Sequence, residues 1–122
     1  MSVSYSFRGQ VLRIDCIGEY TNDELRGAYE AAILDPACPP NAVFLLDVTH
    51  SKSLANRPTE DIRETAYYWG SQSDVFGRRC AIVAPMDLYY GLMRMASLYA
   101  EELGVETAVF RSEEEALEWL GA

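Results

Sequence analysis

Residues 42–47 read AVFLLD, five apolar side chains in succession followed by a carboxylate. An unbroken apolar run of this length is typical of a strand that is buried on both faces, and such strands belong to parallel sheets covered by helices. Residues 80–84, CAIVA, repeat the pattern further along the chain. The two runs predict the central strands of an α/β domain.

The first eighteen residues predict a β-hairpin. Apolar and polar side chains alternate over residues 3–7 and again over residues 12–16, with Arg8-Gly9-Gln10 as the turn between them. Gly18 is expected to end the second strand. Residues 106–110 predict a short fifth strand near the carboxyl terminus.

Two capping boxes mark where helices begin. Thr21 and Glu24 form the first, and Ser112 and Glu115 form the second. In such a box the hydroxyl and the carboxylate satisfy backbone N–H groups that a helix start leaves open. Apolar side chains then recur with helical spacing over residues 25–33. These patterns predict the first and the last helix.

Two more helices are expected between the third strand and the fifth. Pro58, followed by acidic residues, begins one of them, and the other runs from about residue 87 to Leu103, where Gly104 ends it. The alternation of strands and helices requires right-handed crossovers. We therefore predict an α/β fold: a mostly parallel five-stranded sheet with an N-terminal hairpin and four helices, forming one domain over residues 1–122.

The composition argues against several classes of protein. A net charge of −9 repels phosphate, so neither nucleic acid nor an anionic membrane surface is an expected partner. Three cysteines without a CxxC pair argue against zinc and a disulfide framework, and Cys16 and Cys80 are predicted to be buried thiols. No segment is apolar enough for a signal peptide or a membrane span, and we expect a cytoplasmic protein.

Five local motifs accompany this order of elements. They are residues 18–21 (GEYT), 45–48 (LLDV), 76–83 (FGRRCAIV), 90–94 (YGLMR) and 109–120 (VFRSEEEALEWL). With these motifs the chain resembles the SpoIIAA-like family, a branch of the STAS-like superfamily, over nearly its whole length. The resemblance implies a small domain of five strands and four helices that acts as an interaction or ligand-sensing module.

The chain departs from that family at one functional position. In the antagonists for which the family is named, a phosphorylatable serine stands at the start of the helix after the third strand. The resemblance places residues 55–58 (ANRP) there, and none of them carries a hydroxyl. This departure argues against a phosphorylation switch at that position. Thr49, Ser51 and Ser53 are nearby hydroxyls that could accept phosphate, although no recognition sequence surrounds them.

Candidate catalytic groups follow the predicted strands. His50 is the one histidine, but no motif sets a nucleophile beside it, so we interpret it as a polar loop residue. Glu19, Asp47 and Asp87 stand at predicted strand ends, where three carboxylates could bind Mg²⁺. The favoured alternative is that Asp47 bonds loop amides and Asp87 caps the third helix. We therefore expect no enzymatic activity, no metal and no cofactor.

The third helix is apolar almost all round. One stripe, predicted to face the core, consists of Leu88, Leu92, Met95, Ala96, Tyr99 and Leu103. A second stripe, about 100° around the helix, consists of Tyr89, Met93 and Ala100. One sheet face does not cover both, so the second stripe predicts the interface of a homodimer. The alternative is a wide core face with a few exposed aromatic side chains.

The loops after the parallel strands are the predicted contact site, in a crevice at a switch point of the sheet. The candidate residues there are cationic or aromatic: His50, Lys52, Arg57, Tyr89 and Tyr90. Such groups suit an anionic or amphipathic ligand, or the acidic surface of a protein partner. Two functions stay open. One is a noncatalytic regulatory or protein-interaction domain that self-associates; the other is a small carrier or sensor of an apolar ligand held between the second and third helices.

Overall fold

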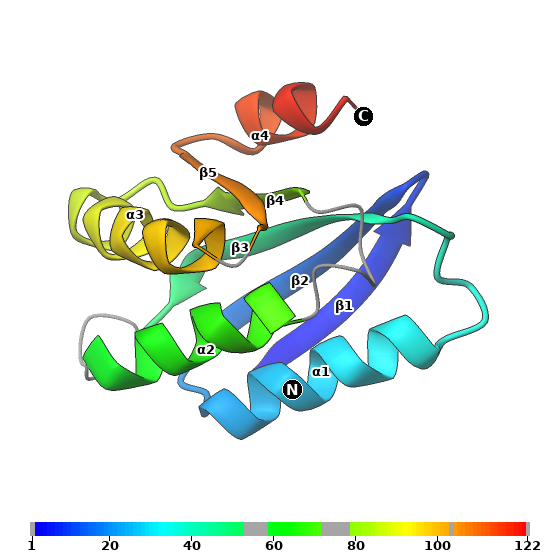
Figure 1. The fold of residues 1–122 in the computed structure, drawn as a ribbon, viewed down its shortest axis with the longest axis horizontal. Coiled ribbons are helices and arrows are strands. Elements are labelled where there is room, and N and C mark those ends of the chain that lie inside the picture. The colour runs from blue at the N-terminus through cyan, green and yellow to red at the C-terminus, as the bar shows by residue number, and fades with distance from the viewer. Residues whose placement is uncertain (1, 53–58, 72–78, 103, 122) are drawn as a thin grey trace.

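The computed structural model describes residues 2–52, 59–71, 79–102 and 104–121. Its strands are β1 (Val3–Arg8), β2 (Val11–Gly18), β3 (Val43–Ser51), β4 (Arg79–Val83) and β5 (Glu106–Phe110). They form a five-stranded sheet in sequential order, with β1 antiparallel to β2 and all other neighbours parallel (Figure 1). The predicted fold class and the N-terminal hairpin are confirmed.

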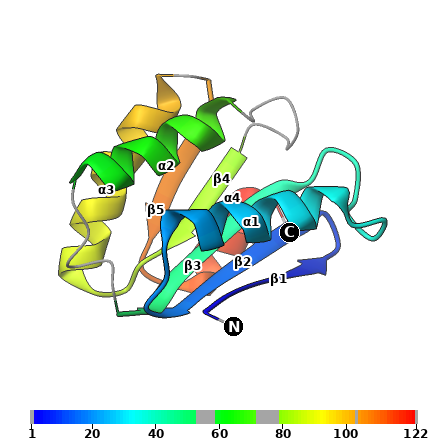
Figure 2. The same cartoon turned by 90° about the horizontal axis from the view of Figure 1, so that it is seen from below.

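The helices cover the two faces of the sheet unequally. They are α1 (Asn22–Leu34), α2 (Thr59–Ser71), α3 (Asp87–Glu101) and α4 (Glu113–Leu120). Helices α1, α2 and α3 lie on one face, and α4 lies on the other (Figures 1 and 2). Right-handed crossovers between strands that follow one another in a single direction place each connecting helix on the same side. Among the described strands the order never reverses, so the expectation of a switch-point crevice is wrong.

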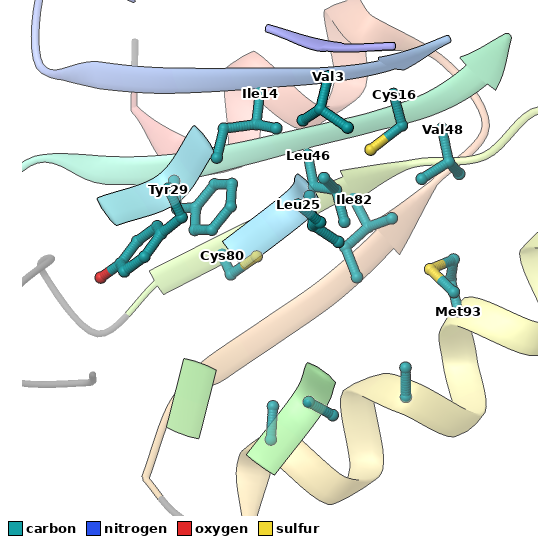
Figure 3. Packing of buried hydrophobic residues seen from close by; sticks show 14 of the residues in the cluster. Val3, Ile14, Cys16, Leu25, Tyr29, Leu46, Val48, Cys80, Ile82 and Met93 are labelled. Carbon is teal, nitrogen blue, oxygen red and sulfur yellow. The ribbon is translucent and has the colours of Figure 1, made fainter. Parts of the chain in front are cut away.

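Both faces of the central strands are buried, as their apolar runs predict. The larger core lies between the sheet and the three crossover helices, and Figure 3 shows part of it. Its fully buried side chains include Leu12, Ile14, Tyr29, Phe44 and Val48. A smaller core lies under α4 and consists of Val11, Leu45, Ala81, Val83, Ala116 and Leu120. Cys16 and Cys80 are buried, which confirms their predicted place.

The helix caps are local and largely follow the sequence. The Thr21 hydroxyl accepts a hydrogen bond from the Glu24 backbone N–H, and the Thr21 backbone N–H donates to the Glu24 carboxylate, so the first capping box is complete. Ser112 accepts from the Glu115 N–H in the same way. Its hydroxyl also donates to the Glu115 carboxylate.

Strand β3 is longer than predicted. The polar residues expected to form a loop after Asp47 continue the strand as far as Ser51. They pair with β2, His50 opposite Ile17 and Ser51 opposite Gly18, beyond an irregularity in the register of β2. Thr49 is half-buried and His50 is exposed, so these polar side chains keep contact with water while the pairing with β2 satisfies the backbone.

The core face of α3 takes in most of both apolar stripes, so it is wider than the favoured prediction. Tyr89, Met93 and Ala100 are only 6%, 5% and 6% exposed, and they face the sheet. Figure 3 shows Met93 directed from α3 toward the strands. Of the stripe assigned to the core, Ala96 is buried and Leu92, Met95 and Tyr99 pack against the core, whereas Leu88 is 56% exposed. Leu103 lies outside the described residues. The assignment of Tyr89, Met93 and Ala100 to a dimer interface is therefore wrong, because the core already covers them.

None of the helices in the described ranges has the length and apolarity needed to cross a bilayer.

Candidate functional site

The carboxyl ends of β2 and β3 and the start of α3 meet around Ser51. The Ser51 side chain is buried, and its hydroxyl donates to the Tyr20 hydroxyl at 3.4 Å. The Tyr89 hydroxyl donates to the Ser51 backbone oxygen at 2.7 Å. The backbone N–H of Lys52 donates to the Gly18 carbonyl at 2.7 Å. These bonds tie three elements together and hold the end of the sheet in one geometry.

This network decides which hydroxyls a modifying enzyme could reach. Ser51 is buried and engaged, so its side chain does not present a phosphate acceptor to solvent. Thr49 is half-buried on β3. Ser53 lies outside the described residues.

Two of the predicted contact residues are exposed beside this hydrogen-bond network. His50 and Lys52 are exposed at the end of β3. Tyr89 is buried, and its hydroxyl bonds the Ser51 carbonyl, so its side chain is not part of the exposed surface. Arg57 lies outside the described residues. The structure thus brings together two of the five candidates as a surface.

Tyr90 is held by a residue that the sequence analysis missed. The Arg111 guanidinium carbon lies 4.4 Å from the centre of the Tyr90 ring. Arg111 also donates to the Asp87 carboxylate at 2.6 Å and to the Pro85 carbonyl at 3.2 Å. Arg111 directly follows β5, and parallel neighbours end at the same edge of a sheet, which is the signal that could have revealed it.

The three carboxylates considered for Mg²⁺ have other roles or places. Asp47 accepts from the Thr49 backbone N–H at 2.9 Å, which confirms its predicted bond to a following amide. Asp87 was expected to cap α3, and this is wrong: Met86 occupies the N-cap position without a side-chain cap, and Asp87 pairs with Arg111. Glu19 is exposed at the same edge as Asp87. Within the described ranges no three His, Cys, Asp or Glu side chains are grouped as metal ligands.

A charged cluster lies on the opposite face of the sheet, beside α4. Arg13 on β2 bonds Asp15 at 3.1 Å and Asp47 on β3 at 2.7 Å. It also pairs with Glu113 at the start of α4. One guanidinium thus joins two strands and a helix. The register places Asp15 directly opposite Asp47, so without Arg13 two carboxylates would face each other.

Large apolar side chains are exposed at the carboxyl edge. Ile17 at the end of β2 is 50% exposed, and Met86 and Leu88 at the start of α3 are 55% and 56% exposed. They stand at the same edge of the sheet as His50 and Lys52: Ile17 pairs with His50, and Tyr89, the residue after Leu88, bonds the Ser51 carbonyl. We call Ile17, His50, Lys52, Met86 and Leu88 the edge surface.

A small apolar cavity of ≈ 40 Å³ lies between the sheet, α2 and α3. Its walls include Val48, Ile62, Ala66, Ile82, Met93 and Ala96. Two hydroxyls at its wall are already engaged: Thr65 donates to the Asn22 side chain and Thr107 to the Val105 carbonyl. The cavity therefore offers apolar contacts and few open hydrogen bonds.

The thiol of Cys80 also lines this cavity. Burial raises its pKa to about 12, because the thiolate loses its hydration there. The thiol is protonated at neutral pH and is a poor nucleophile.

The similarity of this chain to known proteins concerns its fold. No protein-family model and no curated protein matches the chain. A solved structure is similar: an uncharacterized protein of the DUF3478 family with a SpoIIAA-like fold, from Shewanella loihica PV-4. The TM-score is 0.62 and the identity 20%, over 97% of this chain and 91% of that one. The SpoIIAA-like fold predicted from the sequence motifs is therefore confirmed, and at this identity the likeness concerns the fold alone.

Proposed function

We propose that this SpoIIAA-like domain is a noncatalytic interaction domain that contacts a protein partner through its edge surface. The observation that carries the proposal is the exposure of Ile17, Met86 and Leu88 at the same sheet edge as the exposed His50 and Lys52. Large apolar side chains next to polar ones are the usual make-up of a protein contact surface.

Two further features support this surface over others. The hydrogen bonds around Ser51 already hold the backbone at this edge in place. Binding a partner would therefore cost little conformational entropy in this part of the chain. Lys52 places positive charge at one edge of a chain whose net charge is −9. Such local charge favours an acidic patch on the partner and speeds encounter with it.

The test is a comparison of two single substitutions that add the same charge to exposed leucines. Leu88→Glu alters the edge surface, whereas Leu34→Glu alters the end of α1, where Leu34 is 82% exposed. Affinity capture from cells that produce the protein, with quantitative mass spectrometry, should show partners that are lost with Leu88→Glu and kept with Leu34→Glu. If Leu88→Glu retains every partner of the unmodified protein, the edge surface is not the contact site.

Self-association is part of this proposal, with corrected residues. A homodimer would use exposed side chains such as Leu88 and Leu98 of α3, because Met93 lies in the core. Light scattering at micromolar concentration measures the oligomeric state. A dimer that Leu98→Glu dissociates would support the proposal, and a strict monomer would reject it.

A second candidate function rests on the cavity. Its apolar wall suits a small apolar ligand, but its volume of ≈ 40 Å³ is well below the roughly 150 Å³ of an engineered cavity that binds benzene. A lipid-like ligand would therefore require α2 and α3 to move apart. Native mass spectrometry of freshly purified protein tests this candidate. A retained apolar molecule at one per chain would support a carrier, and the bare mass of the chain would favour the interaction domain.

A further inference from the structure

The outer edge of β1 carries backbone groups that point away from the sheet. Strand β1 ends the strand order, and Figure 2 shows it at the border of the sheet beside α1. The Ile17 N–H donates to the Ser2 carbonyl at 2.7 Å, so Ser2 and Ile17 form a hydrogen-bonded pair. Such pairs alternate along an antiparallel ladder. The N–H and C=O groups of Val3, Tyr5 and Phe7 therefore face outward, where no described strand receives them.

A groove of ≈ 630 Å³ runs between this edge and α1. Its floor includes Val3 and Tyr5 of β1, and its wall is formed by small residues of α1, Gly27, Ala28 and Ala31. Ala31 follows Gly27 by four residues and Ala28 by three, so the three lie on one side of the helix. Glu24, one turn earlier, also lines the groove, and its carboxylate is the one that accepts from the Thr21 N–H.

We propose that this groove binds an extended, basic peptide segment of a partner as a sixth strand of the sheet. The outward N–H and C=O groups favour an extended strand as the occupant, because the backbone N–H and C=O groups of a strand have the matching spacing. The small side chains on α1 leave room for apolar side chains at alternate positions of the peptide. Glu24 and the net charge of −9 favour lysine or arginine in the peptide and disfavour a second copy of this acidic chain.

The probe is the synthetic peptide Lys-Val-Thr-Val-Thr-Val-Lys, added to the ¹⁵N-labelled full chain. We expect chemical-shift changes at residues 3–7 and 24–31 at about 1 mM peptide. A peptide with glutamate in place of both lysines should bind about twofold to fivefold more weakly at low salt. A peptide with proline in place of the valines should not bind, because it lacks the N–H groups that pair with β1.

Two matched glycine substitutions test the groove itself. A Cβ at Gly27 meets nothing within 4 Å, and leucine is a better helix former than glycine, so Gly27→Leu keeps the fold while it fills the groove. Gly91→Leu makes the same change on α3, where a Cβ also meets nothing within 4 Å. We expect Gly27→Leu to weaken peptide binding at least about tenfold, and Gly91→Leu to leave it unchanged.

The outcomes separate this inference from the proposed function. Leu88→Glu alters the edge surface and should bind the peptide as the unmodified chain does. Equal binding by Gly27→Leu and Gly91→Leu, or equal binding of the proline peptide, would overturn the strand-binding groove. A homodimer that dissociates only with Gly27→Leu would also overturn it, because a second copy would then occupy the groove.

Discussion

The Tyr89 hydroxyl donates a hydrogen bond to the Ser51 carbonyl oxygen across 2.7 Å, joining the first turn of α3 to the last residue of β3. Removing the hydroxyl leaves a buried carbonyl with one bond fewer. Tyr89→Phe should therefore lower the free energy of unfolding by about 1–2 kcal/mol in urea titrations. Tyr67→Phe, on the exposed side of α2, is the control and should change it by less than about 0.5 kcal/mol. Equal losses of unfolding free energy for the two substitutions would show that the hydrogen bond from Tyr89 to Ser51 does not stabilise the fold.

The burial of Met93 and the exposure of Leu88 predict unequal losses of stability when the two side chains are truncated. Met93→Ala removes a buried side chain beside the existing cavity and should destabilise the protein by about 2–4 kcal/mol. Leu88→Ala truncates an exposed side chain and should cost less than about 1 kcal/mol. Thermal and urea unfolding measure both. A larger loss for Leu88→Ala would restore the assignment made from the sequence.

The Arg13 cluster predicts a salt-dependent loss of stability. Arg13→Met should destabilise the protein by about 1–2 kcal/mol, because it removes the guanidinium from between Asp15, Asp47 and Glu113. Higher salt should reduce the difference by screening the remaining carboxylates. Adding Asp47→Asn should recover part of the loss, since one of the facing charges is then removed. A double-mutant cycle without coupling between Arg13 and Asp47 would contradict this account.

The burial of the Cys80 thiol predicts that the thiol reacts slowly and that the folded protein loses stability at alkaline pH. Its pKa is about 12 in the folded protein and about 8.5 in an unfolded chain. Because the folded value is the higher one, the thiol stabilises the fold below about pH 8.5 and loses this contribution as the pH rises toward 12. Urea titrations from pH 7 to pH 10 should show the decline, and Cys80→Ala should reduce it.

Iodoacetamide labelling followed by mass spectrometry gives an independent measurement of the same thiol. At pH 8 the half-buried Cys38 should react before Cys80, which should label only on unfolding. Rapid labelling of Cys80 in the native protein would contradict its burial.

Much of the fold follows from local patterns in the sequence. Residues 42–47 and 80–84 predict strands buried on both faces because an apolar run leaves no side for water. The capping box of Thr21 and Glu24 marks the start of α1 because its hydrogen bonds span only three residues. The candidate site was predicted in part: His50 and Lys52 stand at the carboxyl edge, as expected from their place after an apolar strand.

The tertiary structure decided what depends on partners distant in the sequence. Both stripes of α3 are apolar, so helical periodicity could not tell that the core takes in most of both. Only the packing shows that Tyr89 turns inward to bond Ser51 while Leu88 stays exposed. The polar end of β3 is a strand because β2 pairs with it. Arg13 meets Asp47 only through the register of two strands. The sequence alone therefore determined the elements and their order, because those arise from neighbouring residues, whereas the faces and contacts that form the site arise from packing.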